Sequence, residues 1–212
     1  MKITLTLISI NIIAFVLSLA NFNPIIENYG FSVNNLLSGH VETLVTSMFL
    51  HGSFLHLAGN MVALLFLGGA IESKVKGWQY LLVYFLAGIL GNLSFFIPLF
   101  GFDYSTIGIG ASAAISGLVG LGTFVSPGKL TMFPIIIPIP FVIAGALFLM
   151  LTSAMLFSTE GQVAYPAHFV GIITGAIFGF LWTKHRIRNS IIFIILVLLI
   201  TIFPFVLQVV FG

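Results

Sequence analysis

Five polar side chains stand in otherwise apolar stretches of the sequence and could do chemistry. They are His51, His56, Asn60, Ser112 and His168. A serine hydroxyl becomes a nucleophile when a neighbouring imidazole removes its proton, and imidazole or amide N–H groups can stabilise the oxyanion that forms. Polar groups inside a membrane span are functional candidates. The set therefore indicates acyl-transfer chemistry if the chain lies in a membrane and brings these groups together.

The composition places the chain in a membrane. Its 212 residues include seven Lys and Arg and five Asp and Glu, so 6% are charged, while 59% are hydrophobic and the mean hydropathy is +1.22. Soluble domains carry about 25% charged residues, and disordered chains are poor in apolar residues, so both classes are excluded. The absence of Cys excludes disulfides and thiol catalysis. A net charge of +2 gives no reason to expect nucleic acid, and the expected partner is the lipid bilayer.

Seven apolar stretches predict seven membrane-spanning helices. Backbone groups in lipid must pair within their own segment, so each stretch predicts a helix and the fold class is an all-α membrane protein. The start of the chain also fits a signal peptide, but its single lysine favours a retained helix. The stretches are Ile3–Ala20, Ser53–Ile71, Trp78–Phe100, Ile107–Val125, Pro138–Phe157, Ala164–Thr183 and Ile191–Val210.

The charged residues predict how these helices are oriented. With Lys2 on the inner side, all seven basic residues fall inside, as the positive-inside rule requires. Four of the five acidic residues fall outside, and only Glu72 falls inside. We therefore expect a cytoplasmic N-terminus and an outer C-terminus in a multi-pass protein of a prokaryotic cell membrane.

This topology brings the polar residues to one depth. The second, fourth and sixth spans run in the same direction, and His56, Ser112 and His168 lie near their outer ends, one or two turns below the surface at ~1.5 Å per residue. Small residues let membrane helices approach closely, so we expect Ser112 and His168 within hydrogen-bond range. The small residues are Gly108, Gly110, Gly117 and Gly120 around Ser112, and Gly171, Gly175 and Gly179 after His168.

Each candidate also has a purely structural explanation. The Ser112 hydroxyl could bond a carbonyl of its own helix, loop carbonyls could cap His168, and Asn60 could join two helices. Each of these roles is common for such a residue alone, and the joint pattern favours the functional interpretation.

Two further residues are expected to be structural. His51 precedes His56 by five positions, about 140° around a helix, so we expect it to face elsewhere. Glu72, at the inner end of the second span, could pair with a nearby lysine or act as a buried acceptor for a neighbouring loop.

Four segments together resemble the rhomboid intramembrane serine proteases. The segment HGSFLHLAGN (residues 51–60) is similar to the HxxxxHxxxN of that family's second helix, and GGAIE (68–72) to the GGxxE at its end. GASA (110–113) resembles the GxSG nucleophile motif, and AHFVG (167–171) the AHxxG of the sixth helix. The resemblance implies a six-helix transmembrane bundle at residues 1–189 and an additional C-terminal helix at 190–212.

The resemblance implies a serine endopeptidase that cleaves transmembrane segments of membrane proteins near the outer leaflet. Ser112 would be the nucleophile and His168 its base, a dyad because no carboxylate is expected at their depth. His56, Asn60 and the Ser112 N–H would stabilise the oxyanion. We expect no cofactor, no metal and no nucleic acid, and the oligomeric state stays open. Structural support would come from His51, Glu72, Gly110 and Gly171.

Three positions depart from the family's pattern. The glycine after the nucleophile is Ala113, and the aromatic residue often found four positions after it is Ser116. A Trp-Arg pair common in the family's long outer loop is replaced by Glu42 and Thr43. These changes affect how the histidine and the loop are held, and they remove no catalytic group.

Three other functions compete with proteolysis. A catalytically inactive rhomboid-like protein would bind transmembrane helices without cutting them. A transporter would use polar groups at the midplane and often an internal repeat, and the sequence has neither feature. A metal site built from His51, His56 and His168 would lack any HExxH motif.

Overall fold

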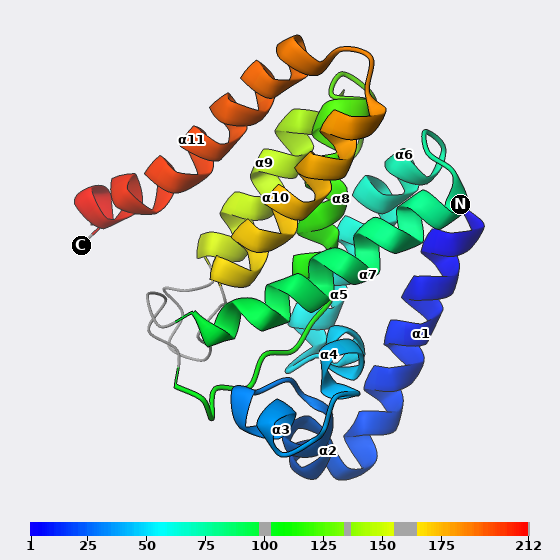
Figure 1. The fold of residues 1–212 in the computed structure, drawn as a ribbon, viewed down its shortest axis with the longest axis vertical. Helices are drawn as coiled ribbons and strands as arrows, with labels where there is room; N and C mark the ends of the chain where they lie inside the picture. The colour runs from blue at the N-terminus through cyan, green and yellow to red at the C-terminus, as the bar shows by residue number, and fades with distance from the viewer. Residues whose placement is uncertain (98–102, 134–136, 155–164, 212) are drawn as a thin grey trace.

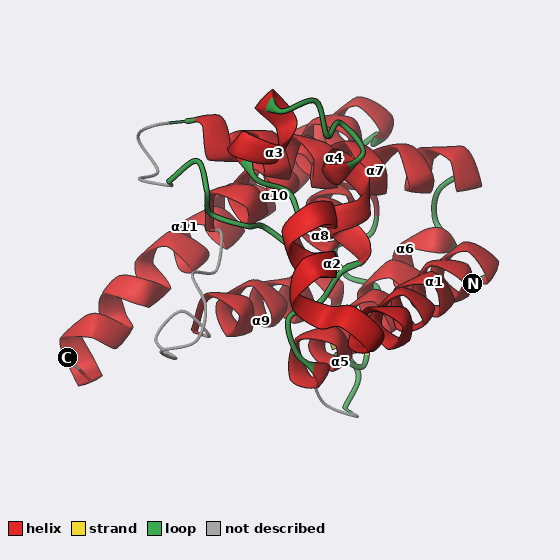
Figure 2. Ribbon diagram, turned by 90° about the horizontal axis from the view of Figure 1, so that it is seen from below, coloured by secondary structure: helices red, strands yellow, loops and turns green. Residues whose placement is uncertain are grey.

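The computed structural model describes residues 1–97, 103–133, 137–154 and 165–211. Most of this part of the chain is helical (Figures 1 and 2). Three 3₁₀ turns, Leu19–Asn21, Ser47–Phe49 and Ser94–Phe96, adjoin the α-helices. The helices are α1 Lys2–Ser18, α2 Phe22–Tyr29, α3 Val33–Leu37, α4 Thr43–Thr46, α5 Phe54–Ala63, α6 Gly69–Glu72, α7 Gly77–Leu93, α8 Ser112–Val125, α9 Phe141–Ala154, α10 Tyr165–Trp182 and α11 Arg186–Phe211.

The helices confirm an all-α membrane fold. Three helical segments, Lys2–Tyr29, Phe54–Glu72 and Gly77–Phe96, are long and apolar enough to cross a bilayer. Three shorter apolar helices correspond to the fourth, fifth and sixth predicted spans, and α11 contains the seventh. α1 and α11 lie on opposite sides of the bundle (Figures 1 and 2). The predicted span ends at Phe100, Phe157 and Ala164 fall outside the described residues.

The fourth span is shorter than predicted. Its helix begins at Ser112, whereas the sequence predicted a helix from Ile107. The preceding residues are extended because Gly108 pairs antiparallel with Phe31, and Gly110 has a φ of +115°, which a helix cannot contain. With 14 residues, α8 is about 21 Å long, whereas the hydrocarbon core of a bilayer is about 30 Å thick. One end of α8 must therefore lie inside the membrane.

The fifth and seventh spans also differ from the prediction at their starts. Ile139–Pro140 forms a short strand, β2, paired antiparallel with β1 at Leu130–Thr131, so α9 begins at Phe141. α11 begins at Arg186, five residues before the predicted start, because the polar end of a helix can lie outside the hydrocarbon.

The second span contains a π-helical turn at residues 64–68 that frees backbone carbonyls. The β1 hairpin satisfies two carbonyls in this region: Thr131 Oγ1 donates to Phe66 O at 3.1 Å, and Lys129 Nζ donates to Ala70 O at 2.8 Å. The second span, which carries His56 near its start, is therefore held at its irregular turn by side chains of the segment that follows α8.

The core of the bundle is α8. Every residue from Ala113 to Phe124 is buried, because α7 and α10 pack along it and α5, α9 and α11 also contact it. At the lower end of Figure 1, α2, α3 and α4 gather beside the start of α5. These short helices therefore lie beside the start of the span that carries His56.

Glu72 joins the opposite end of the second span, at the end of α6, to α1. Its carboxylate accepts hydrogen bonds from Ile3 N at 3.0 Å and Thr4 N at 2.9 Å. Glu72 is thus a half-buried acceptor whose donors lie in the first turn of a helix, and it also pairs with the N-terminal ammonium group of Met1 at 3.1 Å, so its partners are neither a nearby lysine nor a loop. A negative charge at a helix N-terminus is also favoured by the helix dipole.

Replacement of Glu72 by alanine should loosen α1. The loss of the acceptor for two backbone N–H groups is expected to lower the free energy of unfolding by about 1–2 kcal/mol. Thermal unfolding in detergent measures this change, with Glu27→Ala, the loss of an exposed outer carboxylate, as the control. Equal melting temperatures for Glu72→Ala and the wild type would contradict the capping role.

Candidate active site

Ser112 and His168 form a hydrogen-bonded pair between two helices. Ser112 is the first residue of α8, His168 lies in the first turn of α10, and the distance from Ser112 Oγ to His168 Nε2 is 2.7 Å. With the ring proton on Nδ1, the hydroxyl donates to Nε2, which is the arrangement that lets the imidazole remove the proton. Among the described residues none bonds His168 Nδ1, so no carboxylate there orients the ring.

Backbone contact between α8 and α10 sets this distance. A Cβ atom at Gly171 would collide with Ala113 O and lie 3.3 Å from Ser116 Cβ, and one at Gly175 would collide with Gly117 O. The two helices therefore touch through main-chain atoms on the turns that follow Ser112 and His168. The predicted role of the glycine stripe, close approach of the two helices, agrees with this packing.

His56 and Asn60 face the turn that precedes Ser112. A Cβ at Gly110 would lie 2.8 Å from His56 Nε2 and 3.9 Å from Asn60 Nδ2, so glycine is needed there both for this space and for its positive φ. Asn60 is buried, and its amide donates one hydrogen to His56 O at 3.0 Å, which leaves the second hydrogen free. The structure thus brings all four predicted groups to one end of α8.

The contacts of His56 favour one tautomer. Gly52 N–H donates to His56 Nδ1 over a long distance of 3.4 Å, so a neutral ring carries its proton on Nε2, the atom that faces Gly110. The backbone of the same residue is fixed by Ser53, the N-cap of α5, whose hydroxyl accepts from His56 N at 3.1 Å. His56 therefore points an N–H group toward the backbone beside Ser112.

The expectation that His51 faces away from His56 was wrong. The two ring centroids are 5.0 Å apart and the ring planes meet at 68°. The angular argument failed because α5 begins at Phe54, so His51 lies in the extended segment before the helix. His51 is fully buried, and its ring packs edge-to-face with the ring of His56, which is consistent with a supporting role.

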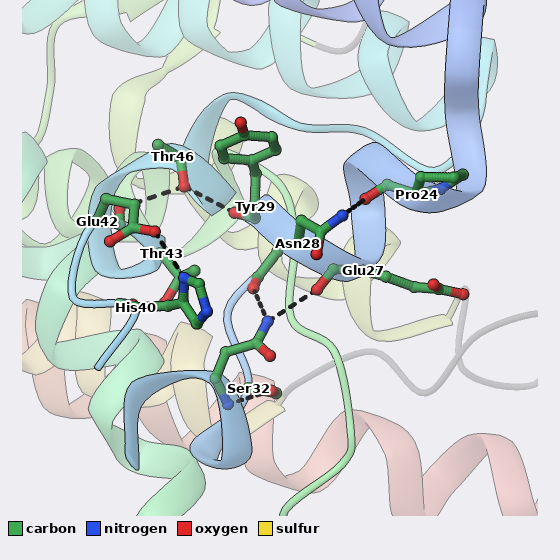
Figure 3. A network of polar contacts seen from close by, with 11 residues as sticks. Pro24, Glu27, Asn28, Tyr29, Ser32, His40, Glu42, Thr43 and Thr46 are labelled. Atoms are coloured by element: carbon green, nitrogen blue, oxygen red, sulfur yellow. Dashed lines mark hydrogen bonds and ion pairs between the residues drawn. The ribbon is translucent and has the colours of Figure 1, made fainter. Parts of the chain in front are cut away.

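The segment between α1 and α5 (residues 19–53), the outer loop of the predicted topology, is held by local hydrogen bonds (Figure 3). The Trp-Arg pair that is common in the family is absent from it. Thr46 Oγ1 donates to Tyr29 O at 2.7 Å, and Thr43 Oγ1 donates to His40 O at 2.7 Å. His40 also bonds the Glu42 carboxylate at 3.0 Å. A backbone N–H, followed by the His40 side chain, lowers the pKa of Glu42. The loop beside the site is therefore ordered by local polar contacts.

The search for polar residues in apolar spans missed Asn92. This amide lies in the last turn of α7, is buried, and bonds Leu44 in α4 and Ser47 in the 3₁₀ turn that follows α4. An asparagine inside the third apolar span was the signal that could have found it.

Fold and site together define a polytopic membrane protein with a serine–histidine pair at the start of a short central helix. A family model for the Rhomboid domain matches residues 38–185. The chain belongs to the rhomboid family.

Named relatives include proteases and an inactive member. The chain is 29% identical over 177 residues to RHOMBOID-like protein 12, mitochondrial, of Arabidopsis thaliana (76% of this chain, 51% of the relative). It is 34% identical over 107 residues to Rhomboid protease GluP of Bacillus subtilis (50% and 20%) and 35% identical over 92 residues to Inactive RHOMBOID-like protein 8 of A. thaliana (43% and 25%). The matched segments span about half the length of these relatives or less.

Gly171→Leu should separate Ser112 from His168. A leucine there must displace the backbone of α8 at Ala113, and a shift near 1 Å can cost ~10²-fold in a reaction that depends on positioning. We expect lost labelling of Ser112 by a fluorophosphonate together with a lower melting temperature. Gly59→Leu is the control, because a side chain at that helical glycine meets open space. Full labelling of Gly171→Leu would show that the glycine stripe does not set the distance.

Proposed function

We propose that this protein is an intramembrane serine endopeptidase that cleaves transmembrane segments of other membrane proteins. The observation that carries the proposal is the 2.7 Å hydrogen bond between Ser112 Oγ and His168 Nε2. Membership of the rhomboid family and the relative named as a rhomboid protease support it.

The reaction would begin with attack by the Ser112 hydroxyl on the scissile carbonyl carbon. His168 Nε2 takes the hydroxyl proton as the C–O bond forms, and then gives it to the amine leaving group as the C–N bond breaks. The product is an acyl-enzyme at Ser112. A water molecule, deprotonated by the same imidazole, then attacks the acyl carbon. The imidazolium returns the proton to Ser112 Oγ as the ester bond breaks and the new carboxyl end is released.

Three N–H donors would stabilise the tetrahedral oxyanion. His56 Nε2 and the Asn60 amide lie beside Gly110, two residues before Ser112, whose own backbone N–H would be the third donor. Ser112 also begins α8, where the helix dipole favours negative charge. In a medium of low polarity such fixed donors are worth more than in water.

The depth of the site favours a transmembrane substrate. Because α8 is shorter than the bilayer is thick, its N-terminal serine lies below the membrane surface when its other end is at the interface. The backbone carbonyls of a helix are engaged in hydrogen bonds, so a substrate helix must unwind locally before Ser112 can attack. We expect small, helix-destabilising residues at the cleaved position.

The same proposal includes orientation and domain organisation. The distribution of basic residues favours a cytoplasmic N-terminus and an outer C-terminus, which puts the site on the outer side. Residues 1–189 would form the catalytic core and residues 190–212 an additional helix. A prokaryotic cell membrane stays our prediction for the location, although one relative is named as mitochondrial.

The second candidate is an inactive protein that binds transmembrane helices. A relative named as inactive and the unusual Ser116 favour it. Labelling of the wild type by a fluorophosphonate, lost in Ser112→Ala, distinguishes the two candidates, because an inactive protein has no activated serine to label.

Ser112→Ala and His168→Ala should each abolish cleavage of a reporter transmembrane segment. Nucleophile and base act as one unit, so the loss of either removes most of the rate enhancement. Cleavage in liposomes measures the effect, and His185→Ala, at an exposed histidine between α10 and α11, is the control. Ser112→Ala with activity near that of the wild type would rule out the serine protease.

Asn60→Ala should slow cleavage without abolishing it. Removal of one oxyanion donor typically costs ~10²–10³-fold, and we expect a loss at or below this range because two other donors remain. The rate constant kcat for reporter cleavage is the measurement. If Asn60→Ala were as inactive as Ser112→Ala, the main role of Asn60 would be structural, to hold α5 in place.

A further inference from the structure

Asn92 has no role in the proposed reaction, but both of its amide hydrogens form hydrogen bonds with the outer loop. The side chain is 8% exposed. Its Nδ2 donates to Leu44 O at 3.0 Å and to Ser47 Oγ at 2.9 Å. These bonds tie α7 to α4 and to the 3₁₀ turn at Ser47–Phe49, across 48 and 45 positions of sequence.

The same loop segment is held on α7 one turn earlier. A Cβ at Gly88 would overlap the side chain of Met48, including its Sδ at 2.6 Å. Gly88 and Asn92 are four residues apart, so they lie on one face of α7. The segment around Ser47 is therefore fixed to α7 by close packing at one level and by hydrogen bonds at the next.

Ser47 passes this constraint to the active site. Its carbonyl oxygen accepts a hydrogen bond from Gly110 N at 2.9 Å. Gly110 carries the positive φ that turns the chain into α8, two residues before Ser112, and it contacts His56. The bonds Asn92–Ser47 and Ser47–Gly110 thus connect the end of α7 to the backbone that aims the Ser112 N–H.

We propose that Asn92 is a positioning residue for the catalytic centre: through Ser47 it fixes the turn at Gly110 that places Ser112 and its backbone N–H beside His56. This proposal rests on the proposed serine-protease function. The physical reason is that a displacement near 1 Å at a positioned reacting group can cost ~10²-fold in rate. Asn92 and Ser47 are buried and Gly110 is half-buried, so water cannot readily replace the bond between the two side chains if it is lost.

Thr46 offers a matched control next to the proposed relay. Its hydroxyl donates to Tyr29 O at 2.7 Å and to Glu42 O at 3.2 Å, within the network of Figure 3. Thr46→Val therefore removes a side-chain hydrogen bond from the same loop segment, whereas the bonds from Asn92 to Ser47 and from Gly110 to Ser47 remain. A general loosening of the loop should affect both variants alike.

The test measures the second-order rate constant for fluorophosphonate labelling of Ser112, which reports the reacting groups without a protein substrate. Asn92→Leu keeps the side-chain volume and removes the donors, and Ser47→Ala is a milder variant that keeps the carbonyl. We expect labelling and kcat for reporter cleavage to fall ~10–10²-fold in Asn92→Leu, and less in Ser47→Ala, with KM nearly unchanged. Thr46→Val should label at the wild-type rate.

A double variant identifies the shared path. If Asn92 acts through Ser47, the combined effect of Asn92→Leu and Ser47→Ala on labelling should be smaller than the sum of the two single effects. Wild-type labelling rates in both single variants, or an equal loss in Thr46→Val, would overturn the positioning role and leave the protease intact. If the wild type and Ser112→Ala were labelled at the same rate, both the protease and the positioning role would be overturned.

Discussion

Backbone contact between α8 and α10 is the constraint on which the site depends. Ser112 and His168 are 56 positions apart in sequence, and close main-chain contact at Gly171 and Gly175 holds their helices near enough for a 2.7 Å hydrogen bond. Lipid tails give helices no hydrophobic reason to associate, so such contact must come from van der Waals packing between small residues. The imidazole has no carboxylate partner among the described residues, and its orientation therefore follows from the placement of α10.

The second constraint is the shortness of α8. The chain before it is extended, pairs with the outer loop at Phe31 and Ser47, and turns at Gly110 into the helix. An extended segment inside a membrane protein must satisfy its backbone groups with protein partners, and here the outer loop supplies them. The loop is therefore part of the site's framework and not only a connection, because the bonds that satisfy this segment also place the N-terminus of α8.

The sequence predicted the helical fold, the seven apolar segments and the meeting of Ser112, His168, His56 and Asn60. These predictions follow from physical requirements that can be seen in the sequence: apolar segments long enough to span a bilayer, basic residues on one side, and small residues where helices touch. It mispredicted the start of α8 and the direction of His51, because hydropathy cannot tell an extended apolar segment from a helix. The partners of Asn92 and Glu72 are long-range contacts, and no local pattern contains them.

Ser116 shows how one departure from the family's pattern fits this packing. Its side chain is buried between the helices: the hydroxyl donates to Ser112 O at 2.8 Å, and Cβ would lie 3.3 Å from a Cβ at Gly171. An aromatic ring at this position would need space that the contact between α8 and α10 does not leave. A small residue there allows the closest approach of the helices. Ser116 thus leaves room for the close contact between α8 and α10, across which the hydroxyl of Ser112 and the imidazole of His168 lie within hydrogen-bond range.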